Sequence, residues 1–402
     1  MAKFIGHTRF SLFTPGKNTW KASRQAVSNE EYAEYLYSTE RLDFRKKIFL
    51  ETSLPLLAQA AANHDLKHVV SFSSNLPQQY KKDLIDAGKK YDFIILDELP
   101  PETPAVNWFD KAKNTIETGE VFATYRLDDD DLVSVNFFNH LSKYVDDAFV
   151  QMIVSFGSGI TAIWDGSQFK RPSLIHKPLL AIGMAEINKK IDETQFLSPA
   201  KGSGYSHMVA DRGNPVILDS RGLDFFWTRS NNQDTLYKQD TSLQRIAEVN
   251  SELENATSEQ IESAFPGLAP LMRYPSIIQL SDNSISVDDS TKFEFHEPQQ
   301  QFSIAIEYEA DSGVRKDSYR ISFKFENTTE NQAIDDLRVR GISKSKDPEI
   351  GHFKPADFKK GNHVARLSVA LPDGFLCSSV RIIRNETEAG HVNLRSVSIQ
   401  EF

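Results

Sequence analysis

The stretch 125-YRLDDDDLVSVNFF-138 decides how the first half of the chain is read, because it places four consecutive carboxylates, Asp128 to Asp131, directly after an apolar run. That run, VFATY at residues 121–125, is typical of a buried β-strand, and SVNFFNHLSKYV at residues 134–145 predicts a helix. Neighbouring carboxylates repel one another, so they need open water or a cation. The fold around this acidic run therefore decides whether it is a solvated loop or a site.

Outward from the acidic run, strand patterns alternate with helix patterns. A helix is expected over 38–64, with a break near Pro55, because proline cannot donate the helical hydrogen bond. Such alternation predicts a mostly parallel sheet with helices on both faces. Ligands of these sheets bind beyond the carboxyl ends of the strands, where the acidic run lies. The remaining expected strands are 4–13, 68–72 and 92–96, and the remaining helices are 77–91 and 108–119.

Two segments after residue 145 have turn and loop signals. The runs FVQMIVSF and GITAIWD predict a hairpin around Gly157 and Gly159. Residues 198–215 have no regular pattern, and Gly202 and Gly204 leave them flexible, so they are interpreted either as a lid over a site or as a plain surface connection.

The last part of the chain has a different period. From about residue 285, apolar residues alternate with polar ones, as in Phe302, Ile304, Ile306 and Tyr308. Several such strands without intervening helices predict an antiparallel β-sandwich. The predicted organisation is thus an α/β domain over 1–240, a helical linker over 241–284 and the sandwich over 285–402.

Composition excludes some classes of protein. A formal net charge of -10 argues against a nucleic-acid partner, since such proteins carry a basic face. The single cysteine, Cys377, cannot form an intramolecular disulfide, and no apolar run is long enough for a membrane span. We therefore expect a cytoplasmic protein, with peripheral membrane association left open.

An acidic D-x-D pattern at a strand end is what nucleotide-sugar transferases use to hold Mg²⁺ or Mn²⁺. The hard cation takes carboxylate and diphosphate oxygens and neutralises the charge on the departing diphosphate. Here Asp128 and Asp130 supply the pattern, and Asp131 is a further candidate ligand. The alternative is that the four aspartates form a solvated loop.

Four blocks of sequence, in this order, resemble the bacterial family named for putative rhamnosyltransferases, which are GT-A-type glycosyltransferases. The resemblance covers roughly residues 4–240 and implies a GT-A fold, a nucleoside-diphosphate sugar donor such as dTDP-rhamnose, and Mg²⁺ or Mn²⁺ on Asp128 and Asp130. We expect the acceptor to be a glycan or a lipid-linked glycan. The blocks are TRFSL, SLPLLAQ, SSNLPQQY and YRLDDDDLVSVNFFNHL.

Donor contacts are expected from residues at strand ends. Arg9 could pair with the diphosphate through its planar guanidinium, and Arg126 and Asp128 are assigned to the donor as well. Asp97 follows another strand and is a candidate for the base or the ribose; its neighbour Glu98 is an alternative.

Later segments supply the remaining candidates. GT-A enzymes often add a histidine ligand near the end of the domain, and FFWTRSNNQDT has none, so His207 is the candidate. Asp211, in the same loop, is the candidate general base for the acceptor hydroxyl. Trp227 and Arg229 are expected either to face the acceptor sugar or to be core.

The sequence therefore predicts a metal-dependent glycosyltransferase. The rival interpretation is a carbohydrate-binding or scaffolding protein on a degenerate transferase fold, in which the sandwich does the binding.

Overall fold

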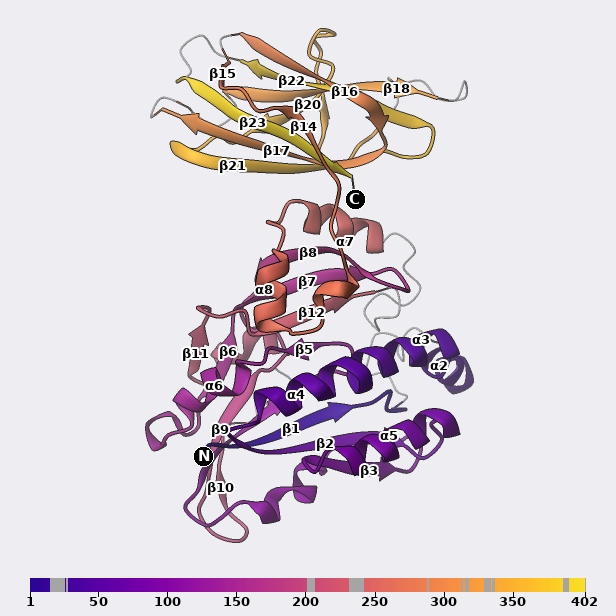
Figure 1. Cartoon of the computed structure of the whole chain (residues 1–402), viewed down its shortest axis with the longest axis vertical. Helices are drawn as coiled ribbons and strands as arrows, with labels where there is room; N and C mark the ends of the chain where they lie inside the picture. The colour runs from indigo at the N-terminus through magenta and orange to yellow at the C-terminus, as the bar shows by residue number, and fades with distance from the viewer. Residues whose placement is uncertain are drawn as a thin grey trace. The chain divides into compact units, whose positions relative to one another are not determined.

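The computed structural model (Figure 1) describes most of the chain, namely residues 1–14, 26, 28–200, 207–230, 242–287, 289–311, 314, 318–328, 334, 337–385 and 390–401. It divides into two compact units. Unit 1 comprises Met1–Leu243 and Asn255–Arg273, and unit 2 comprises Gln244–Glu254 and Tyr274–Phe402. The segment predicted as a linker, 241–284, is thus shared between the units. No helix in the described ranges is both long and apolar enough to cross a membrane.

Unit 1 begins with a strand whose neighbours on both sides are parallel to it. β1 (Lys3–Arg9) lies between β2 (Asp65–Ser73) and β4 (Val121–Arg126), and β3 (Ile94–Leu99) follows β2. The full order of this first sheet is β11-β6-β9-β4-β1-β2-β3, with β10 paired to β9. The added strands are β6 (Ile153–Phe156), β9 (Ala185–Lys190), β10 (Phe196–Leu197) and β11 (Val216–Asp219).

The prediction of a mostly parallel sheet is wrong, because the first sheet is mixed. β9 is antiparallel to β4, to β6 and to β10. The chain reaches β9 from a second sheet and not through a helical crossover, so nothing forces it to run parallel. The α/β class itself is confirmed.

The two faces of the first sheet are covered differently. Phe4 and Val70 face a core shared with α4 (Leu54–Ala60) and α5 (Gln78–Lys90), whereas Ile5 and Val69 face the other way. On that second face the covering residues lie in or next to short 3₁₀ helices, at 108–111 and 113–115. The helix expected over 108–119 is therefore broken into 3₁₀ turns, and the α-helices of this core pack on one face of the sheet.

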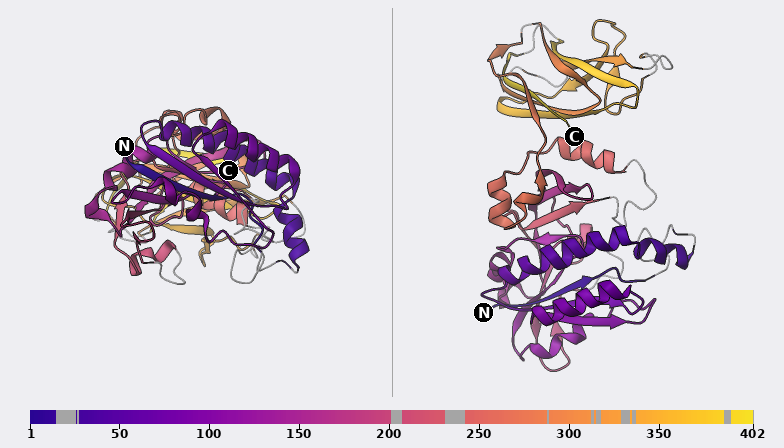
Figure 2. Two further views of the ribbon diagram at one scale, coloured as in Figure 1. Left: turned by 90° about the horizontal axis from the view of Figure 1, so that it is seen from below. Right: turned by 45° about the vertical axis from the view of Figure 1, so that its right-hand side comes forward.

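The long helical segment after residue 38 is continuous past Pro55. α3 (Thr39–Arg45) passes into a π-helical stretch, Lys46–Ser53, and then into α4. Figures 1 and 2 show α3 and α4 as one rod along the sheet. The expected break is absent, and the regular α-helical pattern is interrupted instead by the π-helical stretch that ends two residues before Pro55.

Unit 1 has a second sheet, to which the chain passes after β6 and from which it returns to the first sheet at β9. Its order is β13-β8-β7-β12-β5. The predicted hairpin is wrong, because β6 and β7 belong to different sheets. Gly157 and Gly159 serve close packing instead, since a Cβ would lie 2.4 Å from Ser220 Oγ or 2.3 Å from the Phe225 carbonyl oxygen. The strands are β5 (Leu132–Val133), β7 (Ser158–Trp164), β8 (Phe169–His176), β12 (Phe225–Arg229) and β13 (Met272–Arg273).

The remaining helices are short. They are α2 (Asn29–Leu36), α6 (Phe137–Leu141), α7 (Ser242–Ser251) and α8 (Ser258–Ala264), with 3₁₀ helices at Ser142–Tyr144, Asp147–Phe149, His207–Arg212 and Ala269–Leu271.

Unit 2 contains two antiparallel sheets, ordered β14-β23-β17-β21 with β15 on β23, and β16-β22-β18-β20-β19. The predicted alternation holds, since Phe302, Ile304, Ile306 and Tyr308 are all buried in one core cluster that takes residues from both sheets. This is compatible with the predicted sandwich, whose packing geometry stays a prediction. The strands are β14 (Ile277–Ser281), β15 (Ile285–Ser286), β16 (Ser290–Gln299), β17 (Gln301–Ala310), β18 (Tyr319–Asn327), β19 (Ser343–Lys344), β20 (His352–Ala356), β21 (Gly361–Ala370), β22 (Phe375–Arg384) and β23 (Val392–Glu401).

Candidate functional site

The acidic run lies where two parallel strands of unit 1 end. β1 ends at Arg9 and β4 ends at Arg126, and the two strands are paired in parallel. The chain after β4 enters Asp128–Asp131 directly, and Asp129 accepts a hydrogen bond from the backbone N–H of Ser11, just after β1. The position expected from the sequence, at the carboxyl ends of the strands, is the position in the structure.

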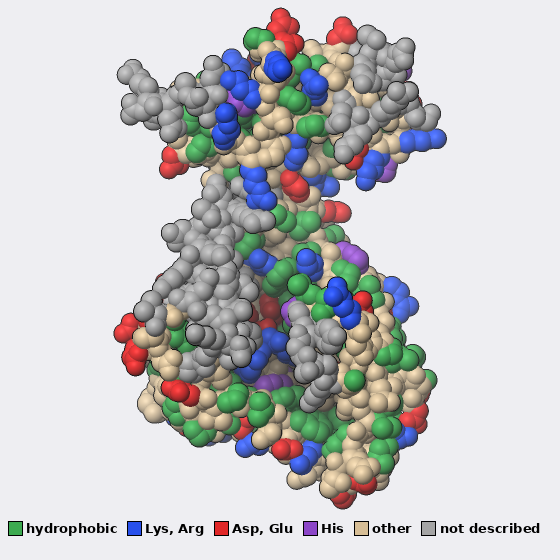
Figure 3. Space-filling model, turned by 180° about the vertical axis from the view of Figure 1, so that it is seen from behind, with side chains coloured by type: hydrophobic (Ala, Val, Ile, Leu, Met, Phe, Trp, Pro, Cys, Tyr) green, Lys and Arg blue, Asp and Glu red, His purple; other side chains and the backbone are tan. Residues whose placement is uncertain are grey.

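Two adjoining cavities open at this edge. The first has a volume of about 530 Å³ and the second about 540 Å³. Arg9, Leu12, Ala181 and His207 line both. In Figure 3 basic, acidic and histidine side chains meet in a hollow on unit 1. Residues found only in the first cavity include His7, Trp108, Arg126 and Glu186, and those only in the second include Tyr32, Asp128–Asp131, Lys177, Trp227 and Arg229.

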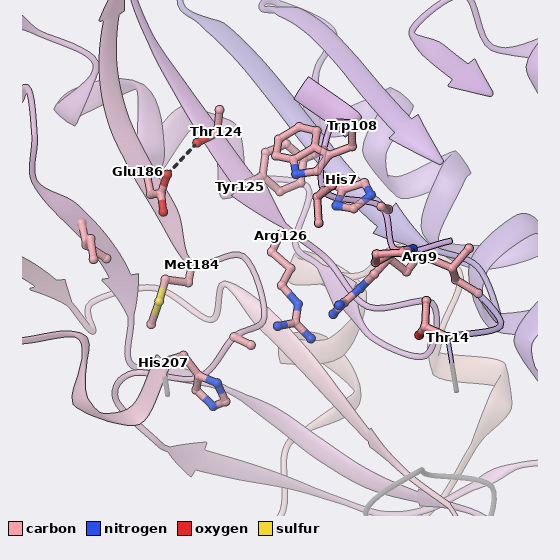
Figure 4. A pocket seen from close by; sticks show the side chains of 16 residues that line it. His7, Arg9, Thr14, Trp108, Thr124, Tyr125, Arg126, Met184, Glu186 and His207 are labelled. Atoms are coloured by element: carbon pink, nitrogen blue, oxygen red, sulfur yellow. Dashed lines mark hydrogen bonds between the residues drawn. The ribbon is translucent and has the colours of Figure 1, made fainter. Parts of the chain in front are cut away.

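One wall of the first cavity is aromatic. The rings of His7 and Trp108 are stacked, with centroids 4.6 Å apart and planes inclined by 2° (Figure 4). Burial, with the charge of Arg9 second, lowers the pKa of His7 to about 3, so the imidazole is neutral at neutral pH. His7 Nε2 lies 3.0 Å from Ser71 Oγ, which donates to Asp97 Oδ2 at 2.9 Å.

Asp97 therefore influences the first cavity only indirectly, through Ser71 and His7. Its side chain is 2% exposed and also pairs with Lys111 at 3.0 Å. It lines neither cavity, so a direct contact with the base or the ribose is not supported. Its neighbour Glu98 pairs with Lys81 at 2.8 Å. The structure places Asp97 behind His7, where it orients the ring through Ser71.

Arg9 and Arg126 meet at Asp128. Arg126 Nη2 donates to both carboxylate oxygens of Asp128, at 2.8 and 2.9 Å, and its Nε donates at 3.1 Å. Arg9 Nη2 lies 3.8 Å from the same carboxylate. Burial opposes the charge of Asp128, but Arg126 and Arg9 outweigh it and keep the pKa below its ordinary value. In Figure 4 both guanidinium groups extend into the cavity.

The next two aspartates are held by a helix. Arg45, on α3, donates to Asp129 Oδ1 at 2.6 Å and lies 2.8 Å from Asp130 Oδ1. The side chain of Arg45 is 3% exposed, so these are buried ion pairs. Arg41, one turn earlier, donates to Ser11 Oγ at 2.8 Å. The run is thereby fixed to α3 and to the end of β1.

Asp131 faces a third element, β12. Its Oδ1 accepts a hydrogen bond from the backbone N–H of Thr228 at 3.2 Å. Burial and the charges of Asp130 and Asp128 raise the pKa of Asp131 well above its ordinary value. On the same strand, the guanidinium carbon of Arg229 lies 4.0 Å from the centre of the Trp227 ring, and both residues line the second cavity.

The two candidate residues of the loop, His207 and Asp211, differ in their position relative to the cavities. His207 begins the 3₁₀ helix His207–Arg212 and lines both cavities. Burial and the charge of Arg126 lower its pKa. Asp211, on the same turn, is exposed and lines neither cavity, so the structure gives its role as general base no support. Residues 201–206 of the predicted lid lie outside the described residues.

The predicted metal ligands do not form a ready cation site. Asp128, Asp130, Asp131 and His207 all line the second cavity. However, no three His, Cys, Asp or Glu side chains in the described ranges are grouped so that they could hold a metal ion. Asp128 and Asp130 are instead paired with Arg126 and Arg45. The donor chemistry suits a hard cation, but the arrangement does not.

Sequence reasoning missed the partners of the acidic run. Arg45 is the most important, and one signal was available, because Arg41 and Arg45 are four residues apart and so lie on one face of a helix. His7 and Trp108 had no such signal, since the two residues are brought together only by the sheet.

Comparisons with known proteins gave one family match and several solved structures of low sequence identity. No curated protein matches the chain. Among solved structures, S. aureus TarS in complex with UDP-GlcNAc is 11% identical, with a TM-score of 0.32, over 65% of this chain and 71% of that chain. HddC from Yersinia pseudotuberculosis is 12% identical, with a TM-score of 0.26, over 60% and 99%.

Another solved structure is similar to a smaller share of the chain. A xylan-binding module, CBM15, is 9% identical, with a TM-score of 0.21, over 32% of this chain and 97% of that chain. The TM-scores of all three structures are too low to carry an argument.

The family match covers the N-terminal segment that contains the acidic run and its arginine partners. The model of the family described as "Putative rhamnosyl transferase" matches residues 3–193. That range includes β1, β4, the acidic run and Arg45, and so contains every residue of the Arg9–Asp128–Arg126 cluster. The N-terminal part of this chain is therefore, as its four sequence blocks predict, similar to the putative rhamnosyl transferase family.

Proposed function

We propose that this chain is a glycosyltransferase that transfers a sugar, rhamnose in the first instance, from a nucleoside-diphosphate sugar to a glycan or lipid-linked acceptor. One observation carries the proposal. Arg9, Arg126 and Asp128 meet between two adjoining cavities, within the segment that matches a rhamnosyl transferase family. The GT-A fold implied by the resemblance is part of the proposal.

The first cavity suits the nucleoside of the donor. Its wall of His7 and Trp108 offers a flat, neutral aromatic surface, on which a base can stack. The cavity volume of about 530 Å³ lies in the range of small-molecule sites. Glu186, near Thr124, supplies an acceptor for a ribose hydroxyl or a base N–H.

The diphosphate then falls at the junction of the cavities. Guanidinium groups bind phosphate oxygens through paired hydrogen bonds, and Arg9 and Arg126 present two of them there. Positive charge placed at the leaving group stabilises the transition state, because negative charge grows on the diphosphate as the sugar departs. The sugar would then lie in the second cavity, beside Trp227 and Arg229.

The divalent cation stays a prediction of the sequence. If bound, it would add a counter-charge for the diphosphate, and Asp128 and Asp130 would hold it. Both carboxylates would first have to leave their arginine partners.

Nucleotide binding tests the proposal. We expect UDP, GDP or dTDP to raise the melting temperature of the full chain, since a ligand that binds only the folded state stabilises it. The matching nucleotide sugar should then be consumed when acceptor is added. A folded chain that responds to none of the three nucleotides would contradict the proposal and favour the rival carbohydrate-binding interpretation.

A further inference from the structure

We infer that two arginines, Arg9 and Arg126, neutralise the leaving diphosphate, and that the acidic run 128–131 anchors arginines and does not hold a catalytic divalent cation. This inference rests on the proposed function, because it concerns how the same site handles its donor. It replaces the role that the sequence assigns to Asp128 and Asp130.

The first argument is the pairing of the carboxylates. Both oxygens of Asp128 accept hydrogen bonds from Arg126, and Asp129 accepts from Arg45 on one oxygen and from the Ser11 backbone on the other. Asp130 shares Arg45 with Asp129. These are short, charge-assisted contacts, the strongest class of hydrogen bond in proteins.

The second argument is what a cation would displace. To take Asp128 and Asp130 together, it must break the pairs with Arg126 and with Arg45. Arg45 is 3% exposed, so its charge cannot turn to water when it loses a partner. A preformed cation site does not carry this cost, since its carboxylates have no competing cation.

The third argument is the charge of the two cavities. Their described linings contain six cationic side chains against five carboxylates, a surplus of one positive charge. A net positive charge attracts the diphosphate, which is negatively charged. A divalent cation would raise it further, whereas the arginines supply it without metal. The cations are Arg9, Arg41, Arg45, Arg126, Lys177 and Arg229, and the carboxylates are Asp128, Asp129, Asp130, Asp131 and Glu186.

The fourth argument is geometry at Arg126. Asp128 is bound through Nε and Nη2 of Arg126, so the ion pair orients the guanidinium, which extends into the first cavity (Figure 4). Asp128 is thus a positioning residue that holds Arg126, and through the 3.8 Å contact Arg9, at the mouth shared by the cavities. Arg45 positions the run itself.

Calorimetric titration of the full chain tests the inference. UDP, GDP and dTDP are each titrated in EDTA and in Mn²⁺, and Mn²⁺ is titrated alone. For the nucleotide that binds, we expect the Kd in EDTA to lie within about threefold of the Kd in Mn²⁺. Mn²⁺ alone should give no saturable heat.

Two sets of variants separate the arginines from the carboxylates. Arg126→Gln and Arg9→Gln should each weaken nucleotide binding in EDTA by about tenfold or more, whereas Asp130→Asn should change it by less than about threefold. Arg395→Gln, in an exposed pair with Glu309, is the matched control and should bind as wild type. If Arg126→Gln does not fold, Arg126→Lys keeps the charge and should still bind more weakly, because it loses the paired hydrogen bonds.

The opposite pattern overturns the inference. In that pattern nucleotide binding requires Mn²⁺, Asp130→Asn abolishes binding and Arg126→Gln retains it. This result would show that the acidic run holds a cation. Binding of no nucleotide in either buffer would contradict the proposed donor and the inference with it. Binding in Mn²⁺ only would leave the proposed function standing and remove the inference alone.

Discussion

The two units bury different kinds of residue. Unit 1 encloses charged side chains within its apolar clusters, whereas no Asp, Glu, Lys or Arg is among the buried residues of unit 2 in the described ranges. The polar residues buried in unit 2 are serines, Asn250 and His352. The charged residues buried in unit 1 are Lys3, Arg41, Arg45, Asp97, Asp129, Asp130, Asp131, Arg171, Lys190, Asp219 and Asp224.

This difference in buried charge distinguishes unit 1, which contains the candidate site, from unit 2, whose interior is an apolar core with a few polar residues. A buried charge is costly to desolvate, and replacing a buried ion pair by apolar residues is often neutral or stabilising. Five of the buried charges of unit 1 line the second cavity, and we attribute these five to the site; they are Arg41, Arg45 and Asp129–Asp131. The core of unit 2 packs aliphatic and aromatic side chains, which fold well but offer no acid, base or counter-charge. We expect unit 2 not to catalyse.

The largest expected effect is at Arg45. Arg45→Met removes the partner of Asp129 and Asp130 and should lower the free energy of unfolding by about 3–5 kcal/mol, the usual cost of leaving buried charges unpaired. Urea unfolding measures it. Arg395→Met removes an exposed pair with Glu309 and should cost less than about 1 kcal/mol. Equal costs for the two variants would contradict the comparison between the units.

The core of unit 2 gives the next effect. Ile304 is fully buried, so Ile304→Ala should lower the free energy of unfolding by about 2–5 kcal/mol through lost packing and a cavity. Val364, on β21, is 41% exposed, and Val364→Ala should cost less than about 0.5 kcal/mol. Nucleotide affinity, measured below the unfolding transition, should be unchanged in both. A loss of affinity in Ile304→Ala would show that the site depends on unit 2.

Stability should fall in acid because unit 1 buries neutral histidines. Burial lowers the pKa of His68 to about 3, and its ring nitrogens lie 2.8 Å from the Tyr125 hydroxyl and 2.9 Å from Thr8 Oγ1. Between about pH 6.5 and 3 the unfolded chain binds the proton and the folded chain does not, so stability is lost as pH falls through this window. The slope is about 1.4 kcal/mol per pH unit for each such group.

Unfolding in urea at pH 7.5 and pH 5.5 measures this slope. In His68→Gln the loss of stability on acidification should be smaller than in wild type by about 1 kcal/mol. His363, an exposed residue of unit 2, provides the control, and His363→Gln should keep the wild-type slope. A slope unaffected by His68→Gln would mean that His68 binds its proton equally readily in the folded and the unfolded chain.

The smallest effect concerns the surface of unit 2. The guanidinium of Arg320 lies 4.6 Å from the ring of Phe353, so Phe353→Ala should cost about 0.5–1 kcal/mol, the value of a solvated cation–π contact. Phe358, by contrast, is 3% exposed and packs on Tyr308. Phe358→Ala should therefore cost about 3–5 kcal/mol in the same urea experiment. Similar costs would show that Phe353 is part of the core as well.

Short-range patterns in the sequence determined much of the fold. The alternation at Phe302, Ile304, Ile306 and Tyr308 fixed which face of β17 is buried, because side chains of a strand point alternately to its two sides. The helix–strand alternation predicted the α/β class, and the apolar run before Asp128 placed the acidic run at a strand end. Each of these features depends on residues close in the chain.

The tertiary structure alone decided which groups meet. Arg45 reaches Asp129 across 84 residues, and the stack of His7 on Trp108 joins β1 to a 3₁₀ turn. The separation of β6 and β7 into different sheets likewise depends on distant strands. No local pattern encodes such partners, because the energy of an ion pair or a sheet pairing depends on distance in space and on burial. The sequence places the four aspartates next to one another and Arg126 two residues before Asp128, whereas only the fold brings Arg45 to Asp129 and Asp130.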